Sequence, residues 1–358
     1  MDERLRPLLG LAPAWLDPGG PEADVVVASR VRLARNLGDA PFPAQMQLGP
    51  ASDFVRRAAA ALAGSIKDGC GLDPTSLGAT DCEFLVERSL ASRDLIHAGR
   101  ATWLYFDPRG LSAVMVNEED HFRIQGYAAG LDLDAALRRA QRLERRLRRH
   151  FDLAVHPKYG YLTSCPTNVG SGMRGSLLMH LPALARAKAP LQQALQTARK
   201  GSLAVRGLHG EGSRALGRLY QISNQQTLGK SSAAQAEEVT SFGRGVAQFE
   251  AQTRQKLRDD ASARQELVAE VARAHARLAG APSLTTSEAL EILSTIRLAA
   301  LAGLSEEIGH EYQAHTVLQQ MFQIQPGHLQ ARLGREMDPG ERDRARAEQL
   351  RDALHLPA

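Results

Sequence analysis

Four clusters of the sequence combine arginines with carboxylates or short glycine segments, a chemistry that suits phosphate groups and a cationic ligand. In Ser29-Arg30-Val31-Arg32 the two arginines share one side of an extended strand, because residues i and i+2 lie on the same face. Residues 117–123 contain three consecutive carboxylates followed by an arginine. Residues 165–174 join a thiol, two glycines and an arginine, and residues 206–211 join an arginine to a single acid.

Five arginines of these clusters are suited to surround one triphosphate. Guanidinium groups form bidentate, charge-assisted hydrogen bonds with phosphate oxygens, and carboxylates beside them suit a cationic acceptor. Taken singly, each cluster is also explained by surface ion pairs. Four clusters on strand ends and loops of one domain favour a functional site. The five residues are Arg30, Arg32, Arg123, Arg174 and Arg206.

Three other patterns resemble known motifs and fail on a required residue. Residues 170–175 fit G-x-G-x-x-G between a predicted strand and a predicted helix, but no acid follows before Glu211, so the ribose contact of a dinucleotide site is missing. Residues 229–231 match the end of a P-loop, but position 224, where the motif requires its first glycine, is Asn224. His310 and His315 would point about 140° apart on a helix, so they do not form a zinc pair. No metal site is predicted.

The composition is that of an ordinary globular protein. Its 358 residues include 44 basic and 40 acidic side chains, and 43% are hydrophobic, which excludes wholesale disorder. Aromatic residues make up 5%, too few for a base-stacking nucleic-acid platform. The apolar runs are shorter than the ~20 residues of a membrane span, and the N-terminus does not resemble a secretory signal. Three cysteines form no closed disulfide framework, which favours a reducing, cytoplasmic setting.

An arginine-rich segment at residues 138–149 stands out, since only six of the 44 basic residues are lysines. Apolar residues recur through it at helical spacing, which predicts an amphipathic helix with arginines on its outer face. A solvated helix face explains the arginines, and a polyanion-binding patch is the alternative.

The elements that position the clusters follow from periodicity and turn residues. Proline and glycine in residues 1–23 predict an N-terminal arm, and periodicity predicts a mixed α+β domain over residues 24–254 and a helical domain over residues 255–358. Short apolar runs between turn signals predict strands. These are residues 83–87, 102–106, 111–116, 121–125, 161–164, 203–208 and 219–222.

Four segments of the chain resemble the ATP:guanido phosphotransferase family. They are residues 29–43, 117–125, 161–184 and 205–231, and weaker similarity continues at 324–330 and 341–347. Within the family they are most similar to the members that phosphorylate arginine side chains of proteins. The resemblance implies an α+β fold in which an antiparallel sheet is flanked by helices and followed by a C-terminal all-helical module. It also implies ATP, with Mg²⁺ held mainly through the nucleotide. The resemblance further implies that residues 24–254 are the catalytic domain and residues 255–358 a regulatory and dimerisation domain.

The resemblance also implies roles for individual residues. Glu119 would orient the guanidinium and accept its proton, Glu211 would be the second clamp, and Cys165 would be the thiolate beside it. The five arginines would bind the ATP phosphates. Ser89 stands where the family usually has histidine. The other residues expected to line the ATP site are Ala28, Ser29, Val31, Gly175, Ser176, Leu177, Leu178, Gly207, Leu208, His209 and Gly210, together with Glu211.

The two ends of the chain bear on the choice of substrate. Only 28 residues precede Ser29, where small-molecule members of the family carry a whole helical domain, so an open site that admits a protein-bound arginine is expected. Residues 342–347 fit R-D-x-x-R-A, which implies an allosteric phosphoarginine pocket formed by Arg342, Asp343, Arg346 and Ala347. The alternatives are a phosphagen kinase acting on free arginine or another small guanidino compound, and a non-catalytic phosphoarginine-binding module.

The resemblance further implies a set of partners. It predicts arginine-containing protein substrates, a homodimer, a zinc-binding activator protein and a Clp-type unfoldase or protease that degrades marked proteins under stress. No membrane and no specific nucleic acid are expected.

Overall fold

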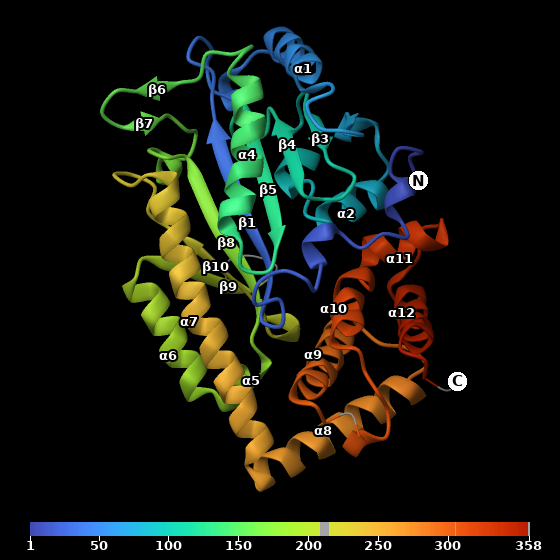
Figure 1. Cartoon of the computed structure of the whole chain (residues 1–358). Coiled ribbons are helices and arrows are strands. Elements are labelled where there is room, and N and C mark those ends of the chain that lie inside the picture. The colour runs from blue at the N-terminus through green and yellow to red at the C-terminus, as the bar shows by residue number, and fades with distance from the viewer. Residues whose placement is uncertain (208–214, 305, 357–358) are drawn as a thin grey trace.

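An antiparallel sheet of eight strands runs through the computed structural model, which describes residues 1–207, 215–304 and 306–356 (Figure 1). The order across the sheet is β2-β3-β4-β5-β1-β8-β10-β9, and a separate hairpin pairs β6 with β7. The strands are β1 (Val26–Arg35), β2 (Cys70–Leu72), β3 (Trp103–Phe106), β4 (Ser112–Val116), β5 (Phe122–Ala129), β6 (Val155–His156), β7 (Gly160–Tyr161), β8 (Met173–His180), β9 (Leu203–Gly207) and β10 (Leu219–Asn224).

Helices pack on both faces of this sheet, and the C-terminal part of the chain forms a helical module of its own (Figure 1). Among the described residues, no helix is both long and apolar enough to cross a membrane. The helices are α1 (Leu48–Leu62), α2 (Ala79–Glu87), α3 (Arg93–Ile96), α4 (Leu133–Leu147), α5 (Pro182–Ala187), α6 (Ala189–Lys200), α7 (Ser232–Asp259), α8 (Ala261–Gly280), α9 (Thr286–Ala302), α10 (Ala314–Gln323), α11 (Pro326–Leu333) and α12 (Pro339–Ala353).

Alternation along the central strand β1 separates the two faces of the sheet. Val31 and Leu33 are buried in the core formed with α1, α4 and α7, while Arg30 and Arg32 lie on the opposite face and are partly exposed. On the covered face, Arg35 donates to Glu144 of α4 at 2.6 Å, which closes this side of the sheet with a buried ion pair. The predicted α+β fold, with a helical module after the sheet, is confirmed.

Three local expectations are wrong. Of residues 161–164, predicted as a strand, only Tyr161 lies in one, at the end of β7. Residues 83–87, predicted as a strand, belong to helix α2, because so short an apolar run suits either element and Phe84 and Leu85 are buried in a helical packing beside α11. The segment after the glycines, expected to start a helix, is strand β8, which pairs with β1 and β10 on its two sides. Its antiparallel pairing on both sides places it in the interior of the sheet.

The N-terminal segment packs against both parts of the molecule. Leu5 and Leu8 are buried in a cluster with Phe84 of α2. Further along, the ring of Trp15 stacks on Tyr127 of β5 and contacts Phe322 of α10 edge to face, with a centroid distance of 5.2 Å for the second pair. Residues 1–23 therefore tie the sheet to the helical module.

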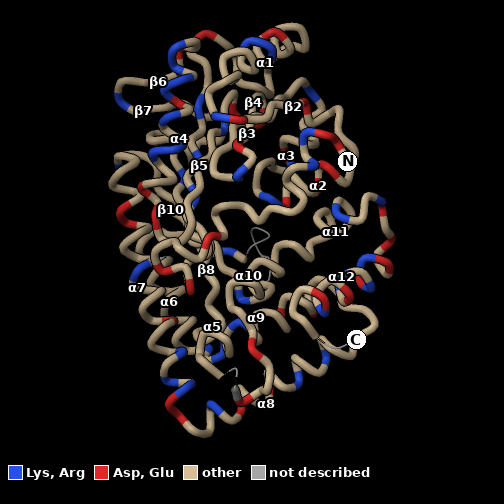
Figure 2. Tube along the Cα trace, turned by 45° about the vertical axis from the view of Figure 1, so that its right-hand side comes forward, with Lys and Arg blue, Asp and Glu red and all other residues tan. Residues whose placement is uncertain are grey.

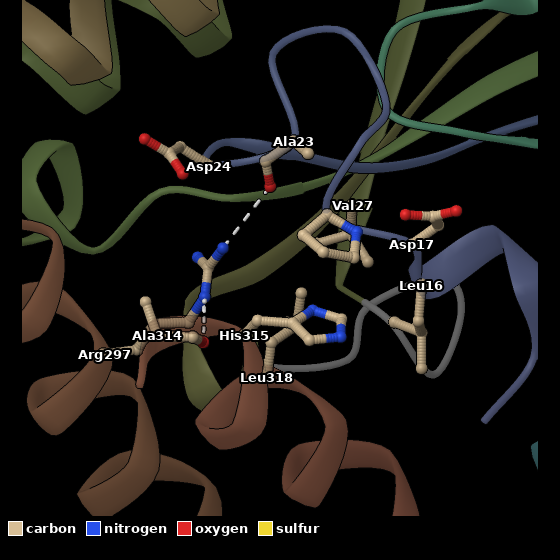
Figure 3. Close-up of a pocket in the computed structure, with 10 residues that line it drawn as sticks. Leu16, Asp17, Ala23, Asp24, Val27, Arg297, Ala314, His315 and Leu318 are labelled. Carbon is tan, nitrogen blue, oxygen red and sulfur yellow. Dashed lines mark hydrogen bonds between the residues drawn. The ribbon is translucent and has the colours of Figure 1, made fainter. Parts of the chain in front are cut away.

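A buried arginine joins the helical module to the end of the sheet. Arg297 of α9 donates to the carbonyls of Ala314 and Ala23 at 3.3 and 3.4 Å, as Figure 3 shows beside a cavity of about 40 Å³. Its Nη1 also lies 2.6 Å from Nδ1 of His180. Arginine has no acceptor, so Nδ1 must be unprotonated and His180 neutral. Burial, with help from Arg297, lowers the pKa of His180 well below its usual value.

A carboxylate makes a second connection between the two parts. Glu87, the last residue of α2, accepts hydrogen bonds from the backbone N–H groups of Gly327 and His328 at 2.8 and 2.9 Å, and the ring of His328 lies 2.8 Å away. These N–H groups belong to the first turn of α11 and have no partner within the helix. A Cβ at position 327 would lie 2.6 Å from the backbone nitrogen of Phe84, so the close approach requires glycine.

Candidate functional site

Strand register brings the five predicted arginines to one face of the sheet. Directly opposed residues of antiparallel strands point to the same side. Arg32 lies opposite Arg174, and Arg30 lies opposite Ser176, across the β1–β8 pair. Arg123 of β5 lies opposite Ala34 of β1, which is on the same side of the strand as Arg30 and Arg32. Arg206 of β9 lies opposite Gln221 of β10, and Gln221 lies opposite Leu178 of β8. Leu178 in turn lies opposite Ala28 of β1, so Arg206 shares the face of Arg30. We call this surface the arginine face.

The arginine face concentrates positive charge. The neighbouring Arg30, then burial, then Arg123 and Arg174 lower the pKa of Arg32 well below its usual value. The buried Nε of Arg32 makes no hydrogen bond within the described residues. A buried polar atom of this kind is rare unless a ligand completes it. This donor set fits the phosphates of a nucleotide, because several guanidinium groups lie on one face of the sheet and guanidinium forks bind phosphate oxygens.

Hydroxyl groups hold two of these arginines in position. Both Nε and Nη2 of Arg174 lie 3.2 Å from the hydroxyl of Ser223 on β10, and Nε of Arg30 lies 3.4 Å from that of Ser176. Hydroxyl oxygens orient a guanidinium without neutralising it. Ser223 and Ser176 thus orient two guanidinium groups on the arginine face.

The three predicted carboxylates lie in the hairpin between β4 and β5, beside the arginine face. Asn117 turns the chain with a φ of 61°, a left-handed conformation that asparagine tolerates. Arg123 then pairs with Glu118 at 2.7 Å and, more closely, with Glu119. The Glu118 side chain is 1% exposed and also accepts a hydrogen bond from Ser92, whereas the Glu119 side chain is 37% exposed. Glu119 is therefore the carboxylate of the two that a ligand can reach.

The loop that carries Cys165 is attached to this hairpin. The backbone N–H of Ser164 donates to Asp120 at 2.8 Å, and the Ser164 hydroxyl donates to the carbonyl of Glu119 at 2.6 Å. Cys165 follows directly, and its sulfur lies 3.0 Å from the hydroxyl of Thr167. Two hydrogen bonds of Ser164 thus attach the loop that carries the thiol to the hairpin that carries Glu119, which is far from it in the sequence.

The environment changes the acidity of the reachable carboxyl group. Burial raises the pKa of Glu119 above its usual value, and the carboxylates of Asp120 and Glu118 add to the rise, while Arg123 opposes it. A raised pKa makes a carboxylate a better proton acceptor near neutral pH. The hairpin therefore offers an exposed base next to a cluster of phosphate-type donors.

Other predicted site residues are distributed differently. Leu208, His209, Gly210 and Glu211 lie outside the described residues, directly after β9. Ser29 faces the covered side, where its hydroxyl donates to the carbonyl of Gly130 and accepts from the N–H of Asp132 before α4. Of the remainder, Ala28, Ser176 and Leu178 share the arginine face, whereas Val31, Gly175, Leu177 and Gly207 alternate with them and face the other way.

Three residues missed by sequence reasoning support the site. Arg100 donates to the carbonyls of Asn117 and Glu118 and so holds the carboxylate hairpin from outside. Tyr127 of β5 donates from its hydroxyl to the carbonyl of Ser89 at 2.9 Å, and Ser92 holds Glu118. These contacts join distant segments, and no spacing pattern in the sequence indicates them.

The R-D-x-x-R-A segment lies on α12, away from the arginine face. Arg346 is 1% exposed and donates to the carbonyls of Ile324 and Leu284 at 3.0 and 2.6 Å and to Asp343 at 2.5 Å. Arg342 donates to the carbonyl of Met337, and Ala347 is buried. In this structure Arg346 ties α12 to two neighbouring loops.

Comparison with family models identifies the class of protein that this fold and site define. Residues 54–253 match the model described as ATP:guanido phosphotransferase, C-terminal catalytic domain, and the chain belongs to that family. Residues 264–358 match the model described as Protein-arginine kinase McsB C-terminal domain. The predicted family is confirmed.

Named relatives and solved structures agree with this assignment. The chain is 36% identical over 349 residues to the protein-arginine kinase of Syntrophomonas wolfei, covering 95% of each chain. It is 37% identical over 355 residues to that of Moorella thermoacetica, covering 95% of this chain and 97% of the relative. The duplicated taurocyamine kinase of Schistosoma mansoni with bound transition-state-analogue components is 28% identical with a TM-score of 0.57, over 67% of this chain and 36% of that one. Lombricine kinase shares the fold at 22% identity and a TM-score of 0.55, over 67% of this chain and 71% of its own.

Proposed function

We propose that this chain is an ATP-dependent kinase that phosphorylates arginine side chains of proteins. The observation that carries the proposal is the arginine face lying beside the exposed carboxylate of Glu119, in a chain that resembles proteins named protein-arginine kinase along 95% of its length. Phosphoryl transfer depends on positioning and charge neutralisation more than on covalent catalysis, and these side chains supply both.

In the proposed reaction, the protein's groups hold donor and acceptor in line. Arg30, Arg32, Arg123, Arg174 and Arg206 bind the phosphates of ATP. Mg²⁺ bound with the nucleotide supplies further neutralisation of phosphate charge. A nitrogen of the substrate guanidinium forms a bond to the γ-phosphorus while the bond from that phosphorus to the β–γ bridging oxygen breaks, and ADP leaves.

The acceptor must lose a proton, because a protonated guanidinium is a poor nucleophile. Glu119 aligns the guanidinium by hydrogen bonds and takes up that proton, a role to which its raised pKa is suited. The Cys165 thiolate lies next to the guanidinium, and Glu211, outside the described residues, is the second carboxylate of the clamp. Two carboxylates meet both edges of the guanidinium fork.

Finer points of the function are also proposals. The resemblance supports a cytoplasmic homodimer that works with a zinc-binding activator and a Clp-type unfoldase or protease. It also supports a division of the chain at residues 23 and 254, and a phosphoarginine pocket at Arg342 and Asp343 of α12. That pocket would depend on Arg346 for its shape, since this side chain holds α12 in place.

Mass spectrometry without acid tests the reaction. The protein is incubated with Mg–ATP and casein, and acid is avoided because the P–N bond is labile. We expect phosphoarginine on casein, a loss of about 10²–10⁴-fold with Glu119→Gln, and no loss with Glu311→Gln, an exposed residue of the helical module. ATP consumption with free arginine but no protein mark would instead favour a phosphagen kinase. Phosphoarginine binding without turnover would favour a reader module.

A further inference from the structure

A cavity next to the catalytic loop is lined by residues to which the proposed reaction gives no role. It has a volume of about 480 Å³ and lies between the β6–β7 hairpin, the segment that leads into α7, and Gly170 and Ser171. In Figure 1 the hairpin and the start of α7 lie side by side at one end of the sheet. This surface is called the hairpin cavity below.

Exposed apolar side chains gather at the hairpin cavity. Among the described residues, six large hydrophobic side chains are exposed. Three of these six line the hairpin cavity. They are Val155 (53% exposed), Tyr159 (44%) and Leu228 (49%). Scattered exposed apolar residues are normal, but a group of them around one hollow marks a surface that another chain covers.

The charged residues of the hairpin cavity are all basic. Arg148, Lys158 and Lys230 line it, and no acidic residue does so among the described residues. Lys158 lies 5.5 Å from the centre of the Tyr159 ring, and Lys230 pairs with Glu238 of α7. A ligand that carries an acidic group next to a large apolar group would be complementary to this lining.

The arginine-rich helix extends this positive surface. Arg138, Arg142, Arg145 and Arg149 are exposed and follow one another at helical spacing along α4 and just beyond its end. None of the ion pairs between described residues includes them. Figure 2 shows the basic residues of α4 in blue near the β6–β7 hairpin. An acidic segment seated in the cavity would find further positive charge on this side.

One loop connects the hairpin cavity with the catalytic residues. At one end Ser164 is bonded to Glu119 and Asp120, and at the other end Ser171 lines the cavity. Thr227 holds the loop between these points, since its hydroxyl lies 2.9 and 2.7 Å from the carbonyls of Thr167 and Val169. A chain that presents its arginine at Glu119 thus has this surface next to it.

We propose that the hairpin cavity binds a segment of the protein substrate that carries an acidic residue beside a large apolar one, close in sequence to the acceptor arginine. The inference rests on the proposed function, because it assigns this surface to the protein substrate of that reaction. A peptide segment fits better than a nucleic acid, since apolar side chains make up much of the lining. The docking explains how a kinase with an open site selects one arginine among many.

Peptide kinetics on the full-length protein test the proposal. Each peptide has one arginine. An Asp-Asp-Phe segment, or a Ser-Gly-Ser segment as control, is placed about four to eight residues before or after that arginine. An extended peptide spans up to ~3.5 Å per residue, so the series samples a range of distances between the two segments. We expect Asp-Asp-Phe to lower KM about tenfold in at least one position with kcat unchanged. Lys158→Glu and Tyr159→Ser should remove this preference. Lys256→Glu, at the other end of α7, is the matched control and should leave it intact.

A binding measurement separates the two proposals. Fluorescence anisotropy with the labelled Asp-Asp-Phe peptide needs no turnover, so it tests the hairpin cavity even if no peptide is phosphorylated, a result that would contradict the proposed function alone. Binding that weakens about tenfold in Lys158→Glu supports the inference. A KM and an affinity that are independent of the flanking segment, or unchanged in Lys158→Glu, would overturn it. So would a Lys158→Glu variant that changes only the self-association of the chain.

Discussion

The guanidinium of Arg123 is paired with the carboxylate of Glu119, four residues earlier in the β4–β5 hairpin. Arg123, proposed to bind phosphate, and Glu119, proposed to act as the base, therefore form an ion pair in this structure. Binding of a phosphate to Arg123 and of a guanidinium to Glu119 would exchange this pair for two intermolecular ones. The contact explains how these two opposite charges stay ordered beside the proposed site.

The pH dependence of the reaction should report this pair. Glu119 acts in its ionised form, so activity falls as the pH drops through its pKa, and Arg123 lowers that pKa. Removing the positive charge with Arg123→Gln should therefore move the acid limb of the kcat/KM profile to higher pH, in addition to reducing activity at every pH. A limb that stays in place while activity falls would show that Glu119 is not the titrating group.

We expect repulsion among the charges of the arginine face to lower the stability of the protein, while the same charges bind the nucleotide. Because Arg32 is surrounded by like charges, Arg32→Met should raise the free energy of unfolding by about 1–2 kcal/mol while weakening ADP binding by at least about tenfold. Chemical denaturation and calorimetric titration measure the two effects. Arg35→Met on the same strand is the contrasting variant, because it breaks the buried pair with Glu144 and should cost about 3–5 kcal/mol. A destabilised Arg32→Met would contradict the role given to the cluster.

Glu250 should make stability depend on pH. Its buried carboxyl group accepts hydrogen bonds from the N–H groups of Ala183 and Leu184 at the start of α5, and burial raises its pKa to about 7. The folded state therefore holds a proton that the unfolded chain releases from about pH 4.5 upward, so stability decreases as the pH rises from about 5 to 7, by up to ~3 kcal/mol. Urea unfolding at several pH values should show that slope, flattened in Glu250→Gln and retained in Glu237→Gln, an exposed residue of the same helix.

The connection between α2 and α11 should matter for stability. Glu87→Ala leaves two backbone N–H groups and His328 without their acceptor, at an expected cost of about 1–3 kcal/mol. Gly327→Ala should also be destabilising, because its Cβ would meet the backbone of α2. Thermal unfolding measures both variants. Glu83→Gln, one turn earlier and paired with the exposed Arg93, should change stability by less than about 0.5 kcal/mol. Equal effects at positions 83 and 87 would contradict the connection.

The two arginines of the α12 motif should differ in their effects. Arg346→Ala removes a buried guanidinium that three acceptors share, so the free energy of unfolding should fall by about 1–3 kcal/mol. Arg342 is less buried and bonds to a carbonyl of its own segment, so Arg342→Ala should leave stability nearly unchanged. Titration with phosphoarginine then tests the proposed pocket, and unchanged affinity in the stable Arg342→Ala variant would argue against it.

Much of the fold and site was predictable because it depends on local patterns and on motifs of a known family. The position of Arg30 and Arg32 on one face follows from a two-residue period. Strands β9 (Leu203–Gly207) and β10 (Leu219–Asn224) agree with the short apolar runs between turn signals at 203–208 and 219–222. Residues 83–87 were assigned to the wrong element, since five residues carry too little periodicity to tell a buried helix from a strand. Their packing beside α11, more than two hundred residues later in the chain, favours the helix.

The residue types and their alternation along a strand can be read from the sequence. Which of these groups lie close together depends on the folded chain. Strand register places Arg174 opposite Arg32, and two hydrogen bonds of Ser164 attach the Cys165 loop to the hairpin that carries Glu119. Burial then distinguished the reachable Glu119 from its covered neighbour Glu118. Contact, desolvation and the interaction between charges all depend on distance in space. Arg32 and Arg174, and likewise Glu119 and Ser164, are far apart in the sequence, so they become neighbours only when the chain has folded.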